Sequence, residues 1–424
     1  MQVSATQDCS RCGTPLPVAD GYVTWCHECG WNLRPVEQDG TAQGRLHRLY
    51  DAAGRRVGNR MASQLRSADR LLPSWTPAKV AAHGIAFGVY GFTAALFAGG
   101  LWLAAGAFPN PAALVAAALM LGAAILMRPR FGRPSAGGAV DRSSAPRLLA
   151  LIDEVASALG TPPVHIVQID EEYNASWAVV GLRRRRVLRL GLPLLAVLDP
   201  QERVAVIAHE LAHGRNGDAR RGFFVGSAVR GLGELYGVVR PEGRIDYDSY
   251  FGIFERIVNV ILYVVSRPAM WLLLVELHLL LRDSQRAEYL ADALAAEAAG
   301  TRAVVGLGEK TLLEPTFRAA VHHAAHARNG GSADVFADFA AAVAAMPEHE
   351  RERRRRVAAL EGARLDDTHP PTAMRIELLE SRPRHEPAVV LDDEGSKAID
   401  AELAARRADF QRELVEDYRD SLYA

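Results

Sequence analysis

The stretch VIAHELAHGRNGD, residues 206–218, places His209 and His213 four residues apart, with Glu210 beside the first histidine. On a helix this spacing puts both imidazoles on one face, one turn apart, so both can reach one metal ion. Glu210 would then lie close enough to hydrogen-bond a water molecule at that ion. The five-residue pattern also occurs by chance, and a buried histidine pair is the alternative. The apolar, capped helix predicted around it favours a metal site.

The sequence also predicts where that helix begins. Asp199 can cap it, Pro200 suits its first position, and Glu202 completes a pattern typical of a capping box. Gly214 is predicted to end the helix directly after the second histidine.

A third ligand must come from elsewhere, because a catalytic zinc takes three protein ligands and leaves one position for water. The best candidate is Glu288, in the predicted helix RDSQRAEYLADALAAEAAG, residues 282–300. Asp292 lies four residues further on the same face, where it could accept the free N–H of a ligand histidine and fix its tautomer. Glu297 is a weaker rival. The alternative, a solvated acidic face, is disfavoured by the surrounding alanines, whose small side chains let two helices approach closely.

All four cysteines fall in the first 30 residues, as CSRC (Cys9, Cys12) and CHEC (Cys26, Cys29), and a glycine follows each pair. Paired thiolates at this spacing can close a tetrahedral zinc shell. Structural disulfides are the alternative, but a cytoplasmic N-terminus would keep the thiols reduced. We therefore predict a small zinc ribbon over residues 1–33 that binds protein, binds nucleic acid or staples a small fold.

Residues 34–79 are predicted to form a flexible linker between the ribbon and a transmembrane helical hairpin over residues 80–127. The hairpin segment contains 48 residues without one Asp, Glu, Lys or Arg. A bilayer core needs roughly 20 apolar residues per helical span. Two spans fit, about Val80–Ala107 and Pro111–Met127, with the sequence FPNP as the turn between them. A buried soluble hairpin of this length would normally show a charged face.

Basic residues flank both ends of this hairpin, whereas its turn carries no charge. They are Arg66, Arg70 and Lys79 before the hairpin, and Arg128, Arg130 and Arg133 after it. Positive residues stay on the cytoplasmic side of a membrane. We expect a multi-pass protein of the cell membrane with its N-terminus, catalytic domain and C-terminus in the cytoplasm.

The segment between the two metal motifs, residues 222–282, is predicted to be a membrane-associated helical insert. Its chain must cross the bilayer an even number of times, because His213 and Glu288 have to meet at one ion. Two crossings need roughly 40 apolar residues, and charges such as Arg230 would be costly at bilayer depth. We favour no crossing, with amphipathic helices on or dipping into the membrane; two crossings are the alternative.

The remaining charge is distributed without a global bias, since the formal net charge is −1. Two arginine runs, in residues 181–191 and 351–356, are interpreted as solvated segments near anionic lipid, and no nucleic-acid partner is expected. Residues 383–424 are predicted to be a linker followed by an amphipathic helix that docks on the protein itself or on a partner. The sequence does not indicate the oligomeric state.

The set of motifs resembles the HtpX-like and CAAX prenyl protease group of membrane zinc metallopeptidases. The matching residues are HELAH at 209–213, SQRAEYLAD at 284–292, NASWAVVG at 174–181 and THPPTAMRI at 368–376. The resemblance implies a mainly helical, α+β zincin-like domain over residues 140–382. The added ribbon and the segment between the metal motifs depart from the group, so its substrates do not carry over.

The resemblance also implies roles for further residues. Asn174, Ala175 and Ser176 correspond to an edge strand that would pair with an extended protein or peptide substrate. His369 and Arg375 are candidates for stabilising the oxyanion.

The function expected is peptide-bond hydrolysis in membrane protein quality control. His209, His213 and Glu288 would hold a catalytic zinc that activates water, and Glu210 would act as general base. A second, structural zinc would be held by the ribbon. The alternative is a catalytically inert, membrane-anchored scaffold whose ribbon binds a partner.

Overall fold

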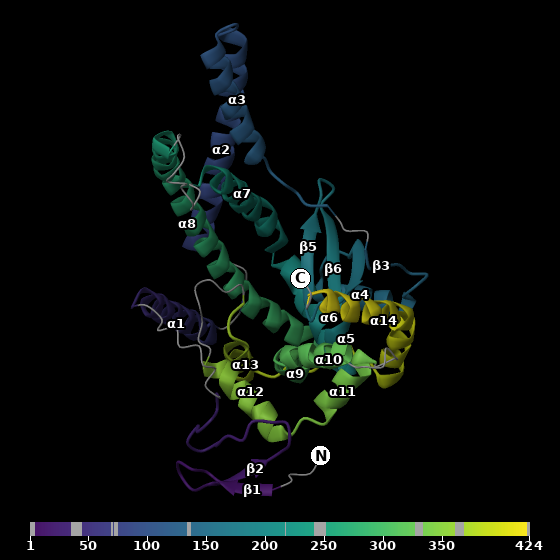
Figure 1. Cartoon of the computed structure of the whole chain (residues 1–424). Coiled ribbons are helices and arrows are strands. Elements are labelled where there is room, and N and C mark those ends of the chain that lie inside the picture. Colours follow the sequence, from purple (N-terminus) through teal and green to yellow (C-terminus); the bar gives the residue numbers. More distant parts are fainter. Residues whose placement is uncertain are drawn as a thin grey trace.

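The computed structural model of the chain describes residues 5–34, 45–68, 71, 75–133, 137–216, 218–240, 252–326, 334–360 and 369–421. Arg70 and Thr368, which the sequence analysis used, lie outside the described residues. Helices dominate and two small sheets accompany them (Figure 1). This confirms the predicted class, a mainly helical chain with an α+β domain.

The larger sheet contains four strands: β3 (Ala139–Val140), β4 (Ile166–Asp170), β5 (Ala175–Val180) and β6 (Arg185–Gly191). Their order is β3-β4-β6-β5, with β4 and β6 parallel and the other pairs antiparallel. The predicted edge strand is therefore found as β5, which has a strand neighbour on one side only among the described residues.

Helices surround this sheet and continue to the C-terminus. They are α4 (Pro146–Leu159), α5 (Leu192–Leu195), α6 (Pro200–Arg215), α7 (Asp218–Val239), α8 (Gly252–Ala299), α9 (Thr301–Thr311), α10 (Glu314–His326), α11 (Val335–Ala344), α12 (Glu348–Leu360), α13 (Thr372–Glu380) and α14 (Asp393–Ser421). One apolar core joins α4, β6, α6 and the end of α8 through residues such as Ile152, Leu188, Ile207 and Ala295. The core thereby fixes α6 and α8 against each other.

Helix α6 begins as predicted but ends later. A capping box forms at Asp199, whose backbone N–H donates to Oε2 of Glu202 at 2.9 Å. The prediction that Gly214 ends the helix is wrong, because α6 continues to Arg215. Gly214 instead lets Trp177 approach, since a Cβ atom at this position would lie 3.0 Å from the indole ring.

Helix α14 docks on the protein itself, which decides between the two interpretations of the C-terminal segment. Leu403 and Phe410 are buried in the main core. The Glu402 carboxylate accepts the backbone N–H groups of Arg147 and Leu148 at 2.7 and 3.1 Å, in the first turn of α4. Negative charge at a helix N-terminus is favourable, so this contact fastens α14 to α4.

The predicted hairpin is present as α2 (Pro77–Gly106) and α3 (Pro111–Leu126). It projects away from the sheet, with its turn at the far end of the molecule (Figure 1). Large apolar side chains point outward along it, and Trp102 exposes 76% of its surface. Exposed apolar surface on this scale is typical of a helix pair in contact with lipid.

The structure differs from the prediction for the insert before Glu288. Helix α8 is one continuous helix of 48 residues, so no break separates the insert from the helix that was predicted over residues 282–300. The number of membrane crossings stays a prediction. Its first half packs with α2 and α7 in a second apolar cluster that includes Ala86, Val225 and Leu273. The segment from Ile257 onward is apolar and long enough to span a membrane, as is α2. One of the charged residues that interrupt the apolar stretch, Glu276, is buried.

The segment predicted as a flexible linker, residues 34–79, is partly helical. It contains a helix of 22 residues, α1 (Arg45–Arg66), whose Leu65 is buried against Tyr289 and Leu378. Val57, Met61 and Leu65 repeat every four residues and were the signal for this helix.

Candidate metal centre and substrate cleft

Helices α6 and α8 bring three of the predicted ligands together. Nε2 of His209 lies 3.3 Å from Nε2 of His213, and the carboxylate oxygens of Glu288 lie 3.4 and 3.5 Å from these two atoms. Zinc–ligand bonds of roughly 2.0–2.1 Å in tetrahedral geometry separate the donor atoms by roughly 3.3 Å. Two imidazoles and one carboxylate are also the donor set of a catalytic zinc. The residues present therefore fit a zinc ion with an open fourth position.

A layer of charged groups lies behind these ligands. Nδ1 of His209 lies 3.0 Å from Oδ1 of Asp292, in the arrangement expected for a carboxylate that orients a ligand histidine. Arg375, on α13, donates from Nε and Nη2 to Asp292 at 2.7 and 2.6 Å, and its Nη1 lies 3.2 Å from Oε2 of Glu288. The Arg375 guanidinium thereby fixes both carboxylates relative to the histidines.

These contacts shift the pKa values of the buried groups. Burial alone would raise the pKa values of Glu288 and Asp292, but Arg375 and His209 lower them, that of Asp292 to about 2. Burial lowers the pKa of His209, but the Asp292 and Glu288 carboxylates outweigh it and raise this pKa to about 10. Burial and the neighbouring His209 lower the pKa of His213. The carboxylates are thus ionised at neutral pH, as metal ligands and their partners must be.

The predicted base, Glu210, is buried where two cavities of about 660 and 680 Å³ meet. Both cavities are also lined by Asn174, Ala175 and His369. The second follows the whole of β5 as far as Val180, so the edge strand and the metal ligands open into one continuous cleft. A chain laid along β5 would pass directly beside Glu210.

The opposite wall of this cleft was not foreseen from the sequence. It is formed by Phe223 on α7, by Arg230 and by residues 130–132, which follow the hairpin. Phe131 stacks on Phe223 with ring centroids 4.6 Å apart, and its carbonyl accepts the backbone N–H of Gly181 at 2.7 Å. No local sequence pattern predicts this wall, because its residues come together only when α7 packs beside the hairpin.

The two predicted oxyanion donors occupy different positions. Nδ1 of His369 lies 3.0 Å from Oε2 of Glu288, while 60% of the His369 side chain is exposed at the cleft. Arg375 differs from its predicted role, because its N–H groups already face Asp292 and Glu288. It is better described as a positioning residue. Glu297, the rival ligand, is exposed and lies away from the cleft.

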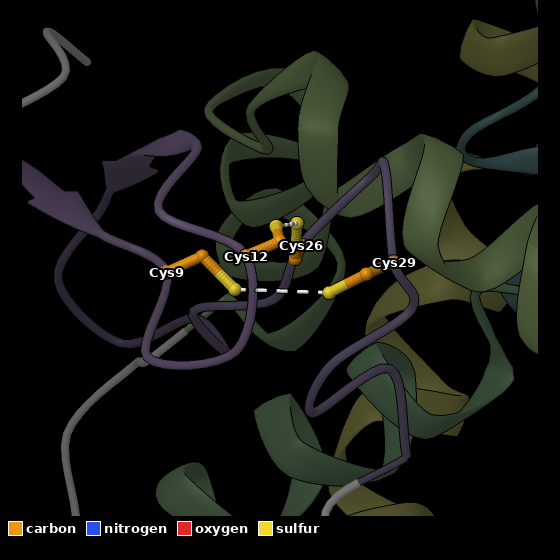
Figure 2. Close-up of side chains that lie close together, drawn as sticks. All are labelled: Cys9, Cys12, Cys26 and Cys29. Carbon is orange, nitrogen blue, oxygen red and sulfur yellow. Dashed lines mark hydrogen bonds between the residues drawn. The ribbon is translucent and has the colours of Figure 1, made fainter.

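The four cysteines converge on one another (Figure 2). They belong to the N-terminal segment, drawn in purple at the end of the molecule opposite the turn between α2 and α3 (Figure 1). Sγ of Cys9 lies 3.7 Å from that of Cys29, and Sγ of Cys12 lies 3.5 Å from that of Cys26. Zn–S bonds of roughly 2.3 Å give sulfur separations of roughly 3.8 Å in a tetrahedron, so the cluster fits a zinc ion with four thiolate ligands.

The chain around the cysteines is built from short turns. Gly13 and Gly30 adopt positive φ values of 74° and 68° and donate backbone N–H groups to the carbonyls of Cys9 and Cys26. Strands β1 (Ala5–Asp8) and β2 (Pro15–Val18) form a two-stranded sheet beside them. The ribbon therefore needs little apolar core.

The ribbon rests on α12, and this contact corrects the interpretation of the arginine run at residues 351–356. Nε1 of Trp25 donates to the carbonyl of His349 at 3.1 Å, and the Arg356 guanidinium lies 5.1 Å from the Trp25 ring. Arg353 and Arg354 pair with the buried Glu350 instead of facing lipid. The run is a structural clamp between ribbon and catalytic domain.

Comparisons with known proteins agree with this geometry. The model of peptidase family M48 matches residues 142–383, which is more than half of the chain and contains every residue of the His/Glu centre. The chain belongs to peptidase family M48. It is thus a metallopeptidase with helices suited to a membrane.

A curated relative supports the same assignment over a shorter stretch. The chain is 35% identical over 78 residues to the protein described as "Protease HtpX homolog" from Acidiphilium cryptum (strain JF-5). The alignment covers 18% of this chain and 27% of that protein, so the chain spans about a quarter of that relative's length. No solved structure matches.

Proposed function

We propose that this M48 metallopeptidase is a zinc endopeptidase that cleaves extended segments of proteins at the membrane surface, as part of membrane protein quality control. The observation that carries this proposal is the tetrahedral spacing of His209, His213 and Glu288 beside Glu210, in a cleft that runs along an edge strand. The family membership supports hydrolysis of protein or peptide substrates.

Each residue of the cleft has a task in this mechanism. Zinc, when bound, polarises the scissile carbonyl and lowers the pKa of a water molecule. Glu210 accepts the proton of the attacking water and passes it to the leaving amine. Backbone groups of Asn174–Ser176 pair with the substrate as an added strand, which aligns its amide with Glu210. His369, at the exposed rim, is the candidate donor to the oxyanion.

The arrangement of helices supports a multi-pass topology with two hairpins. Outward apolar side chains continue from α2 and α3 onto α8, including Val260, Val264 and Trp271. Helix α7 leaves the catalytic domain and α8 returns to it. The histidine and glutamate ligands therefore lie on the same side of the membrane, which requires an even number of crossings between them. Arg128, Arg130 and Arg133 lie at the domain end of the first hairpin, which favours a cytoplasmic domain.

The proposal is tested by Glu210→Gln in full-length protein assayed on casein. Loss of the base should lower the rate by roughly 10²–10⁴-fold, while the zinc content stays that of the parent. The matched control is Glu297→Gln, an exposed carboxylate on α8 that should keep full activity. Absence of chelator-sensitive cleavage in the parent would instead favour the inert scaffold.

A further inference from the structure

A third cavity, remote from the substrate cleft, lies where α1, the start of α2 and α8 meet. It has a volume of about 330 Å³ and is lined by four arginines, Arg56, Arg60, Arg282 and Arg286. One carboxylate, Asp283, lines it with them. The walls of this arginine cavity therefore carry a formal charge of +3.

Among the described residues, no carboxylate forms an ion pair with these four arginines. Nε of Arg282 and Nε of Arg286 are buried without a hydrogen-bond partner in the part of the chain that the structure describes. The four guanidinium groups that line the cavity can donate N–H groups to an anion that supplies oxygen atoms.

The cavity lies at the level where the apolar helices begin. Thr76, in its lining, caps α2, the first helix able to span a membrane. Beside it, Trp75 is 67% exposed with Nζ of Lys79 4.9 Å above its ring, an aromatic and basic pair typical of the lipid headgroup level. On α8, Arg282 follows directly after the apolar stretch that ends at Leu281.

From these observations we infer that the arginine cavity binds the phosphate of an anionic phospholipid headgroup. Guanidinium groups match phosphate oxygens with paired N–H donors. Basic pockets between membrane helices on the cytoplasmic side suit such headgroups. The lipid would join α1 and α2 to the part of α8 that continues into Glu288, and so brace the helix that carries the third ligand.

The test measures lipid binding to the full-length protein in detergent micelles by native mass spectrometry, with phosphatidylglycerol and phosphatidylcholine of identical acyl chains. We expect saturable binding of phosphatidylglycerol. Arg56→Gln/Arg60→Gln should weaken it by at least about tenfold, because each basic residue contributes roughly 1 kcal/mol to anionic-lipid binding. Both positions are exposed on α1, so the fold is retained.

The matched control is Arg55→Gln/Arg183→Gln, which removes the same charge from exposed positions outside the cavity and should bind as the parent does. Arg282→Gln provides a second variant on the opposite wall and should also weaken binding. Equal binding by the parent, the cavity variants and the control would overturn the inference. Complete displacement of the lipid by equimolar inorganic phosphate would overturn the lipid assignment in favour of the free ion.

Discussion

The cysteine cluster and the His/Glu centre hold their donor atoms at tetrahedral spacing by different means. The cysteine cluster takes four donors of one kind from turns within 30 residues, which closes its coordination shell. The His/Glu centre takes three donors from two helices, and Glu288 follows His213 by 75 residues. Among the described residues, the His/Glu centre has a buried layer of charged partners and a cleft beside it, and neither is found at the cysteine cluster. This difference is the one expected between a site that stabilises a small fold and one that performs chemistry.

The sharpest test of this difference removes a donor from each site. Glu288→Gln should abolish cleavage and release one of two zinc ions per chain, because the open site has no ligand to spare. Cys9→Ser/Cys12→Ser should release the other zinc and leave the rate constant of the remaining folded enzyme within a few fold. Metal analysis with a casein assay measures both. A parent protein with one zinc would contradict one of the two sites.

A smaller effect is expected from the layer behind the ligands. Asp292→Asn should weaken zinc binding by about 10–100-fold, the range typical for partners of a ligand histidine. It also leaves Arg375 with one weaker acceptor. Competition with a chelator of known affinity measures the change. Unaltered zinc affinity would show that Arg375 and Glu288 position His209 without Asp292.

The pH dependence of the stability of the metal-free protein tests the electrostatics of the His/Glu centre. The pKa of His209 is raised from 6.5 to about 10. Protonation therefore stabilises the fold, fully below pH 6.5, and this stability is lost as the pH rises through 10. We expect the melting temperature of chelated parent protein to fall over this window more than that of His209→Gln. Parallel curves would contradict the raised pKa.

The smallest effect concerns the clamp on the ribbon. Arg356→Ala removes the guanidinium from the Trp25 ring and should lower the free energy of unfolding by roughly 1 kcal/mol. Urea unfolding followed by tryptophan fluorescence measures it. Arg318→Ala is the control, because the Arg318 side chain is 77% exposed and pairs with Glu314 one turn away on the same helix. Equal losses in the two variants would argue against a clamp.

Local patterns predicted the parts of both sites that depend on neighbouring residues. The capping box at Asp199, the helix end at Gly300 and the paired CxxC turns each need only a few consecutive residues, and the structure has them. The α2/α3 hairpin follows from composition in the same way.

What the sequence did not reveal depends on distant partners. Arg375 is predicted as a donor to substrate until Asp292, 83 residues away, occupies its N–H groups. The arginine run in α12 resembles a lipid-facing segment until Glu350 and the ribbon cover it. The continuity of α8 was obscured by charged residues within the apolar stretch, such as Glu276, which the structure buries.

That continuity has a mechanical consequence. With 48 residues at 1.5 Å each, α8 has a contour length of roughly 70 Å, and Pro268 lies inside it. Its apolar part is long enough to span a membrane, and its other end carries the Glu288 carboxylate, whose position relative to the histidines must be accurate. We therefore expect the rate of cleavage to change with the acyl-chain length of the surrounding lipid, because a change in the tilt of α8 would move Glu288 relative to the two histidines.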